Sequence, residues 1–206
     1  MSHAAVFVDK DGTLVTNVPY NVDPAQLRFE PGALAALARL VSVGLEIVII
    51  SNQSGLGRGL FTWPQFLDLR QALERRLRDE AGVALRGFYI CPHAPDAQGQ
   101  ATCDCRKPAP TLLLRAAQRL DLDLSRSWMV GDTLDDVEAG RRAGCRTILY
   151  DSGGETLWRD APERRPHARR THWSEVAATI LADAWRERPS AGHTRAPRPA
   201  AWQRAG

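Results

Sequence analysis

The chain has 206 residues, of which 44% are hydrophobic and 25% are charged, and its formal net charge is +3. This is enough apolar material for one buried core, and no apolar run approaches the roughly 18 residues that a membrane span needs. Residues 1–150 hold 17 Lys plus Arg and 17 Asp plus Glu, so the net positive charge arises entirely after Tyr150. The composition argues against a membrane-spanning protein and against a basic nucleic-acid-binding domain in the first 150 residues.

Buried strands and amphipathic helices are predicted to alternate along the chain. The strands are expected from short apolar runs, and the helices from apolar spacing with Pro near the start and Gly after the end. The expected strands are 4–8, 45–50, 85–90, 127–130 and 146–150, and the last of these closes the series. The first expected helix opens at Pro31 and stops at Gly44. The other expected helices cover 63–81, 111–120, 133–143 and 174–185. This alternation predicts an α/β fold with right-handed crossovers and a parallel three-layer sheet.

Two carboxylates two residues apart, Asp9 and Asp11, follow the first predicted strand, and Gly12 then lets the chain turn away. In open α/β sheets ligands bind outside the carboxyl ends of the strands. A carboxylate there can act as a nucleophile toward phosphorus, and the second can donate and retrieve a proton. The alternative is an Asp-rich turn in which these residues serve only turn chemistry.

Three further motifs follow in order along the chain. Ser51 and its small polar neighbours end the second predicted strand, Arg106 and Lys107 supply adjacent cations, and Asp132, Asp135 and Asp136 follow the fourth strand. Together with Asp-x-Asp-Gly-Thr at residues 9–13, this set resembles the haloacid dehalogenase-like superfamily of aspartate-based phosphatases. The roles of Asp135 and Asp136 stay open: one could support Lys107 or the metal's waters, or both could cap the helix.

A cluster of thiols and one imidazole lies between the second and third of these motifs. Thiolates and neutral imidazole are the preferred ligands of zinc, and four such ligands leave no open position for water, so the site should be structural. The alternatives are incidental cysteines or a disulfide, and the lack of a recognisable secretory signal disfavours the disulfide. Cys145 is expected to be a small buried residue instead. The four predicted ligands are Cys91, His93, Cys103 and Cys105.

The motifs together are similar to those of the heptose bisphosphate and histidinol phosphatases of that superfamily. The resemblance covers about residues 4–150, including the run 51–59 and the zinc loop followed by Arg106-Lys107-Pro108. It implies a Rossmann-like three-layer fold with no large cap domain and a zinc-stapled loop. Pro110-Thr111-Leu112 departs from the family pattern, and nothing after about Asp151 matches well, so the substrate is less firmly indicated than the reaction.

The resemblance implies a role for each motif residue. Asp9 would be the nucleophile, Asp11 the acid and base, and Lys107 and Ser51 would stabilise the phosphoryl oxygens. Mg²⁺ would be held by Asp9, the Asp11 carbonyl and Asp132. The residues expected to bind substrate are Asn17, Val18, Pro19, Tyr20, Asn52, Gln53, Ser54 and Arg106.

The sequence therefore predicts a cytoplasmic phosphatase domain over residues 1–185 and a basic, disordered tail over 186–206. The expected substrate is the 7-phosphate of D-glycero-D-manno-heptose 1,7-bisphosphate, with histidinol phosphate as the near alternative. A nucleic-acid 3′-phosphatase and a non-catalytic zinc-bearing scaffold are weaker alternatives. The expected partner is thus a small phosphorylated sugar and not a nucleic acid or a membrane, and a monomer is the working expectation.

Overall fold

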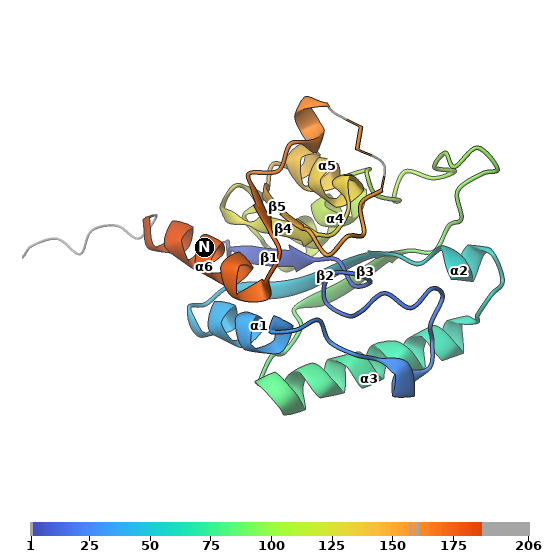
Figure 1. The fold of residues 1–206 in the computed structure, drawn as a ribbon, viewed down its shortest axis with the longest axis horizontal. Helices are drawn as coiled ribbons and strands as arrows, with labels where there is room; N and C mark the ends of the chain where they lie inside the picture. The colour runs from blue at the N-terminus through green and yellow to red at the C-terminus, as the bar shows by residue number, and fades with distance from the viewer. Residues whose placement is uncertain (1, 157, 160, 187–206) are drawn as a thin grey trace, which may run out of the picture.

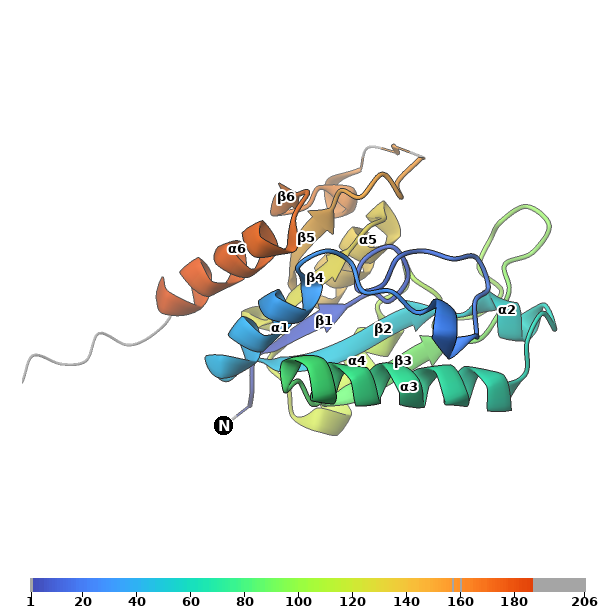
Figure 2. The same cartoon turned by 60° about the horizontal axis from the view of Figure 1, so that its bottom comes forward.

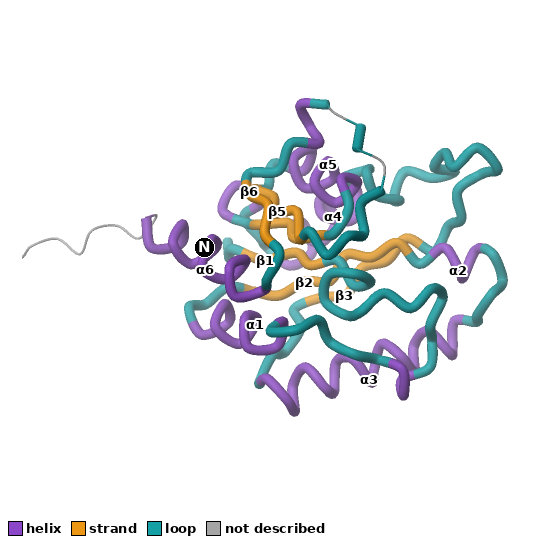
Figure 3. Tube along the Cα trace, viewed as in Figure 1, coloured by secondary structure: helices purple, strands orange, loops and turns teal. Residues whose placement is uncertain are grey.

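A six-stranded parallel sheet in the order β3-β2-β1-β4-β5-β6 runs through the molecule (Figures 1 and 3). The structure is a computed structural model and describes residues 2–156, 158–159 and 161–186. The predicted tail, apart from Arg186, lies outside these residues. The strands are β1 (Ala5–Val8), β2 (Glu46–Asn52), β3 (Gly87–Cys91), β4 (Trp128–Gly131), β5 (Arg146–Tyr150) and β6 (Ala168–Arg170).

Five of these strands lie within two residues of their predicted bounds, but the prediction that 146–150 is the last strand was wrong. The short strand β6 pairs in parallel with β5, with Ala168 opposite Ile148 and Arg170 opposite Tyr150. It has three residues, none of them fully buried, and two are arginines. A strand this short and polar carries no apolar run, so only its pairing with β5 defines it.

The helices agree with the predicted periodicity and end signals. Helix α3 begins after Thr62, whose backbone N–H donates to the side chain of Gln65 at 2.8 Å, and it ends at Gly82 with φ +65°. Helix α1 begins two residues later than the predicted start at Pro31, because Gly32 adopts a left-handed conformation with φ +79°. The helices are α1 (Ala33–Ser42), α2 (Ser54–Gly57), α3 (Trp63–Ala81), α4 (Thr111–Leu120), α5 (Leu134–Ala143) and α6 (Trp173–Arg186), with 3₁₀ turns at Pro24–Gln26, Leu124–Arg126 and Pro162–Arg164.

Helices cover both faces of the sheet, so its central strands are buried on both sides (Figure 2). Alternate residues of β1 enter different cores: Val6 and Val8 pack with α1, α3 and α6, whereas Ala5 and Phe7 pack with α4 and α5. The fold is therefore the predicted three-layer α/β arrangement. Among the described residues no helix is both long enough and apolar enough to cross a bilayer.

The strand order places the candidate site at a switch point of the sheet. The chain passes from β1 to β2 on one side, and β4 returns to pair with β1 on the other. The loops that leave β1, β2 and β4 therefore diverge at the carboxyl edge and open a crevice there. Helix α6 also reaches this edge, because the buried Trp173 donates its Nε1–H to the carbonyl of Thr13 at 2.8 Å.

Candidate active site

Asp9 lies at the carboxyl end of β1 and is 7% exposed. Its backbone N–H donates to the carbonyl of Val130 in β4 at 2.9 Å, so the pairing of β1 with β4 continues to this residue. The Asp9 carboxylate accepts a hydrogen bond from the Lys107 ammonium. Burial raises the pKa of Asp9 well above its ordinary value and Lys107 opposes this, while the neighbouring carboxylates of Asp136 and Asp132 raise the pKa further.

Lys107 comes from the loop after β3 and is 4% exposed. Its ammonium also pairs with the Asp136 carboxylate at 2.6 Å and donates to the carbonyl of Ile50 at 3.1 Å. Burial lowers the pKa of Lys107, but Asp136 and Asp9 raise it above the ordinary lysine value. Asn52 holds the lysine backbone: its side chain accepts from the Lys107 N–H at 3.1 Å and donates to the Lys107 carbonyl at 3.3 Å.

Asp132 follows β4 and packs directly against backbone. Its Oδ1 accepts from the Thr13 hydroxyl at 3.2 Å, and burial followed by the charge of Asp136 raises its pKa to about 7. A Cβ atom added to Gly12 or to Gly154 would lie 2.2 Å or 2.1 Å from Asp132 Oδ2. Two chain segments therefore approach this carboxylate as closely as only glycine permits.

The buried carboxylates fit a divalent cation. One carboxylate oxygen each of Asp9, Asp132 and Asp136 can be chosen so that the three lie within 4.8 Å of one another. Asp136 is already committed, because it pairs with Lys107 and its Oδ2 accepts from the Thr133 hydroxyl at 2.7 Å. Asp136 therefore both supports Lys107 and caps helix α5, whereas Asp135 pairs with Arg164. Asp9 and Asp132 are thus the two carboxylates of this group that are available to a hard cation such as Mg²⁺.

The Asp11 carboxylate is hydrogen-bonded to Gln53, which follows β2, and to its neighbour Lys10. Its Oδ2 accepts from the side-chain amide of Gln53 at 2.9 Å, and the same amide donates to the Ser51 hydroxyl at 2.8 Å. Its Oδ1 accepts from the Lys10 ammonium. The structure therefore joins the end of β1 to the end of β2 through Gln53, with Asp11 partly open to solvent and Ser51 buried.

A cavity of about 250 Å³ opens beside Asp11. It brings together seven of the eight residues expected to bind substrate, and Arg106 is the one that does not line it. The Nη1 atom of Arg106 is buried and has no hydrogen-bond partner among the described residues. The lining residues are Asp11, Asn17, Val18, Pro19, Tyr20, Asn21, Asn52, Gln53, Ser54, Gly55 and Phe61.

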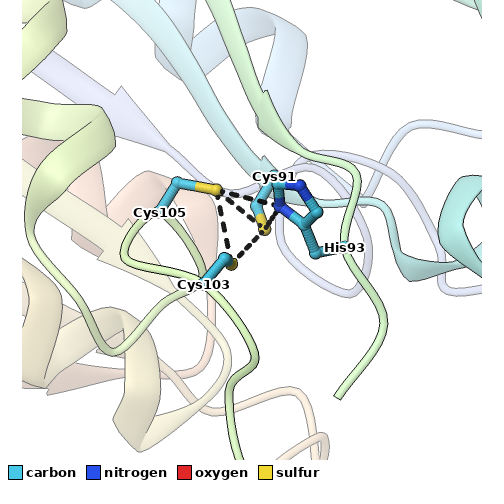
Figure 4. Close-up of side chains that lie close together, drawn as sticks. All are labelled: Cys91, His93, Cys103 and Cys105. Carbon is cyan, nitrogen blue, oxygen red and sulfur yellow. Dashed lines mark hydrogen bonds between the residues drawn. The ribbon is translucent and has the colours of Figure 1, made fainter. Parts of the chain in front are cut away.

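The four predicted zinc ligands form one cluster, which Figure 4 shows. The Cys91 sulfur lies 3.4 Å from that of Cys103 and 3.2 Å from that of Cys105, and the His93 Nδ1 lies 3.6 Å from the Cys91 sulfur. These separations are far longer than a disulfide bond and close to the edges of about 3.6–3.8 Å that a zinc-centred tetrahedron would have. Cys145 lies apart, buried against the apolar core of α4 and α5.

The loop over residues 91–105, which carries the Cys/His cluster, lies against the elements that form the cavity. The N–H of Gln53 donates to the Cys91 carbonyl at 2.8 Å, and that of Gly57 donates to the Pro92 carbonyl at 2.9 Å. A Cβ atom on Gly57 would come within 2.8 Å of the Pro92 oxygen. Helix α2 is thus packed directly onto the backbone of this loop.

Sequence reasoning missed several residues of the site. Phe61 and Asn21 line the cavity, and Gly154 contacts Asp132, although no motif marks any of them. Ser152 also reaches the site, since its hydroxyl donates to the Gly12 carbonyl at 3.0 Å. The Ser-Gly-Gly run at 152–154 is a local sequence feature compatible with a close backbone approach after β5, although it does not identify Asp132 as the residue approached.

Comparisons with known proteins agree with this geometry. The family model described as HAD-hydrolase-like matches residues 104–175. The D-glycero-β-D-manno-heptose-1,7-bisphosphate 7-phosphatase of Photorhabdus laumondii is 42% identical over 162 residues, which cover 77% of this chain and 86% of the relative. The protein of that name from Pasteurella multocida is 38% identical over 162 residues, with 78% of this chain and 88% of the relative covered.

Solved structures give the same result. The D,D-heptose 1,7-bisphosphate phosphatase from B. bronchiseptica, complexed with magnesium and phosphate, superposes with a TM-score of 0.76 at 30% identity. The match covers 87% of this chain and 99% of that structure. A putative HAD-like phosphatase from Mesorhizobium loti has a TM-score of 0.73 at 32% identity, with 88% and 86% of the two chains covered.

Proposed function

The chain belongs to the haloacid dehalogenase-like family of heptose bisphosphate phosphatases, and we propose on that basis that it removes the 7-phosphate of D-glycero-D-manno-heptose 1,7-bisphosphate. The observation that carries the proposal is the position of Asp9. It lies close to a buried ammonium and a second buried carboxylate, and it precedes by two residues Asp11, which lines the cavity. This arrangement supports transfer of a phosphoryl group to a carboxylate followed by hydrolysis.

The first step transfers the phosphoryl group to Asp9. A carboxylate oxygen of Asp9 attacks phosphorus, the bond from phosphorus to the sugar oxygen breaks, and Asp11 gives its proton to that oxygen as it leaves. Lys107, which bonds Asp9, and Ser51, which bonds Gln53, would neutralise and hydrogen-bond the phosphoryl oxygens as charge shifts onto them.

The second step releases phosphate. Asp11, now a carboxylate, takes a proton from water while the water oxygen attacks phosphorus, and the bond to the Asp9 oxygen breaks. Free phosphate leaves and Asp9 returns as a carboxylate. Asp11 ends the cycle with the proton that it gave up in the first step, so both residues are regenerated.

Magnesium is the cofactor that the site supports. The carboxylates of Asp9 and Asp132 would hold the ion, and we propose the Asp11 carbonyl as the third protein ligand. When bound, Mg²⁺ offsets the negative charge that the buried carboxylates and the phosphate bring together. The raised pKa of Asp9 agrees with this assignment, because burial and the neighbouring carboxylates of Asp136 and Asp132 disfavour the charged form and Lys107 does not fully offset them.

We propose that Cys91, His93, Cys103 and Cys105 bind one structural zinc ion. The separations within the cluster support a closed four-ligand site, which leaves no position for water or substrate. We also propose a cytoplasmic location, where the three thiols would stay reduced and able to bind the metal.

The substrate is tested by phosphate release from three compounds at equal concentration with Mg²⁺. These are the heptose 1,7-bisphosphate, histidinol phosphate and an oligonucleotide with a 3′-phosphate. We expect the heptose to be hydrolysed with the highest kcat/KM, and phosphorus NMR should find the 1-phosphate retained in the product. Faster turnover of either other compound, or loss of the 1-phosphate, would overturn the proposed substrate.

A further inference from the structure

Lys10 is a buried cation that the mechanism above does not use. It lies between the two carboxylates of the first motif, and only 3% of its surface is exposed. Lys10 lines a small cavity together with Val15 and Leu69. Its ammonium pairs with Asp11 Oδ1. A buried ammonium is costly unless a partner compensates it, so this ion pair is a built feature of the site.

Lys10 is also one of only two lysines in the sequence. Of the 27 Lys plus Arg residues, 25 are arginine, and the two lysines are Lys10 and Lys107. Both are buried at the site, and each bonds an aspartate of the first motif. A slim stem with a compact ammonium fits such a position, where a planar guanidinium needs more room.

The other side of the Asp11 carboxylate is held by Gln53, which is 6% exposed and donates to Oδ2 at 2.9 Å. Gln53 is fixed in turn by its bond to the Ser51 hydroxyl at 2.8 Å. Both oxygens of Asp11 are thus held, one by each neighbour. The side chain nevertheless keeps 31% of its surface exposed and lines the cavity.

We propose that Lys10 is a positioning residue that holds the Asp11 carboxyl group where it can reach the leaving oxygen of the substrate. The proposal rests on the proposed function only for the assignment of Asp11 as the acid and base. A proton donor must lie within hydrogen-bond reach of the atom it protonates, and an aspartate on an exposed turn would otherwise sample several rotamers. Lys10 and Gln53 together restrict that freedom before the substrate arrives.

The consequence depends on the leaving group. A sugar alkoxide is a poor leaving group and needs the proton from Asp11, whereas an aryl oxide with strong electron withdrawal leaves without it. If Lys10 acts through Asp11, Lys10→Met should lower kcat for the heptose bisphosphate by about 10- to 100-fold and kcat for p-nitrophenyl phosphate by less than about 3-fold. KM for either substrate should change little.

A double-mutant cycle tests whether the effect passes through Asp11. Lys10→Met, Asp11→Asn and the double variant are compared on both substrates. If the two residues act as one unit, Lys10→Met should change kcat by less than about 2-fold once Asp11 is Asn. Arg28→Met is the control, because Arg28 binds carbonyls of the neighbouring loop and does not touch Asp11; both of its activities should be unchanged.

Several outcomes would overturn the proposal. Equal losses on the two substrates would show that Lys10 supports the fold and not the acid, and so would full additivity in the cycle. If Lys10→Met loses its cooperative thermal transition, Lys10→Gln carries the same comparison with a polar group in the same space. If the wild type hydrolyses another alkyl phosphate and not the heptose, the proposed substrate fails, but the alkyl-to-aryl comparison still tests Lys10.

Discussion

Single glycines determine how closely the backbone approaches the catalytic carboxylates. Gly12 has φ +80°, and a side chain there would collide with Asp132. A Cβ atom added to Gly131 would lie 2.2 Å from the Cβ atom of Asp136. Gly154 is different, because its φ is not in the left-handed region and only the contact with Asp132 demands glycine. It therefore offers a test in which backbone strain plays no part.

Gly154→Ala should displace the Asp132 carboxylate and weaken Mg²⁺ binding. We expect the Mg²⁺ concentration for half-maximal activity to rise by at least about 10-fold, with kcat at saturating Mg²⁺ within about 3-fold of wild type. A magnesium titration of phosphatase activity measures both. Ser152→Ala removes one hydrogen bond in the same loop and is the control. An unchanged magnesium requirement in Gly154→Ala would rule out the contact with Asp132 as a determinant of metal affinity.

Asp9→Asn should abolish turnover and leave the fold intact, because the amide is nearly isosteric with the carboxylate but is a poor nucleophile. Activity should fall by more than about 1000-fold. Circular dichroism and thermal melting would confirm that the variant folds. Activity at a tenth of wild type or more would mean that another group attacks phosphorus.

At the scale of elements, the loop over residues 91–105 and helix α2 form one unit. The loop carbonyls of Cys91 and Pro92 accept from the N–H groups of Gln53 and Gly57, and the chain continues from the cluster directly into Arg106 and Lys107. We therefore expect disorder in this loop to displace both the cavity residues and Lys107.

Cys103→Ser should remove zinc and destabilise this unit. We expect metal analysis to fall from about one zinc per chain to well below half, and the melting temperature to fall by more than about 5 °C. KM for the substrate should rise as the loop loses order. Cys145→Ala is the matched control, since it alters a buried thiol outside the cluster. The zinc proposal fails if wild-type protein contains no zinc, or if Cys103→Ser melts like wild type.

The edge pair of strands contains a pH-sensitive contact. The Thr147 N–H in β5 donates to His167 Nδ1 at 3.0 Å, so this histidine must be neutral to accept the bond. Burial, with the charges of Arg141 and Arg146, lowers the pKa of His167. The unfolded chain then binds a proton first as pH falls, so stability is full above about pH 6.5 and is lost as pH falls from there through the lower folded pKa.

His167→Asn should reduce this pH dependence, because the amide oxygen can accept the same bond and does not titrate. Melting temperatures measured at pH 7.5 and pH 5.5 should differ less in the variant than in wild type. The same pH dependence in both proteins would show that the Thr147–His167 contact does not contribute to it.

At the scale of the whole molecule, α6 closes the structure onto the first motif. Trp173 is fully buried, packs against Tyr150 and binds the Thr13 carbonyl, and α6 lies along α1. The sequence of the predicted tail offers little to bury, so we expect the tail to take no part in this contact.

Two truncations should therefore behave differently. Removal of residues 187–206 should leave kcat and the melting temperature unchanged. Removal of residues 173–206 should destabilise the protein by several kcal/mol, because it exposes the core that Trp173, Val176 and Ile180 cover. Denaturant unfolding and activity assays check both, and equal stability of the two truncated chains would contradict the role of α6.

Most of this architecture could be predicted because the central strands are continuous apolar runs and the helices carry capping and stop residues. Helix α3 has its predicted bounds, and the four motifs identified the carboxyl edge. Strand β6 and the approach of Gly154 to Asp132 could not be predicted, since each depends on a contact between distant segments and not on local sequence. The cavity residue Phe61 was missed for a different reason, because an isolated aromatic residue gives no periodic signal.

The bond from Trp173 to Thr13 joins residues 160 positions apart, and this has a consequence for the order of events during synthesis. Asp9 leaves the ribosome before Asp132, Gly154 and Trp173, which follow it along the chain by 123 to 164 residues. A nascent chain cannot complete the metal site or cover the core beneath it until almost the whole domain has emerged. Catalytic competence is thus expected only after the segment that carries Trp173 has emerged.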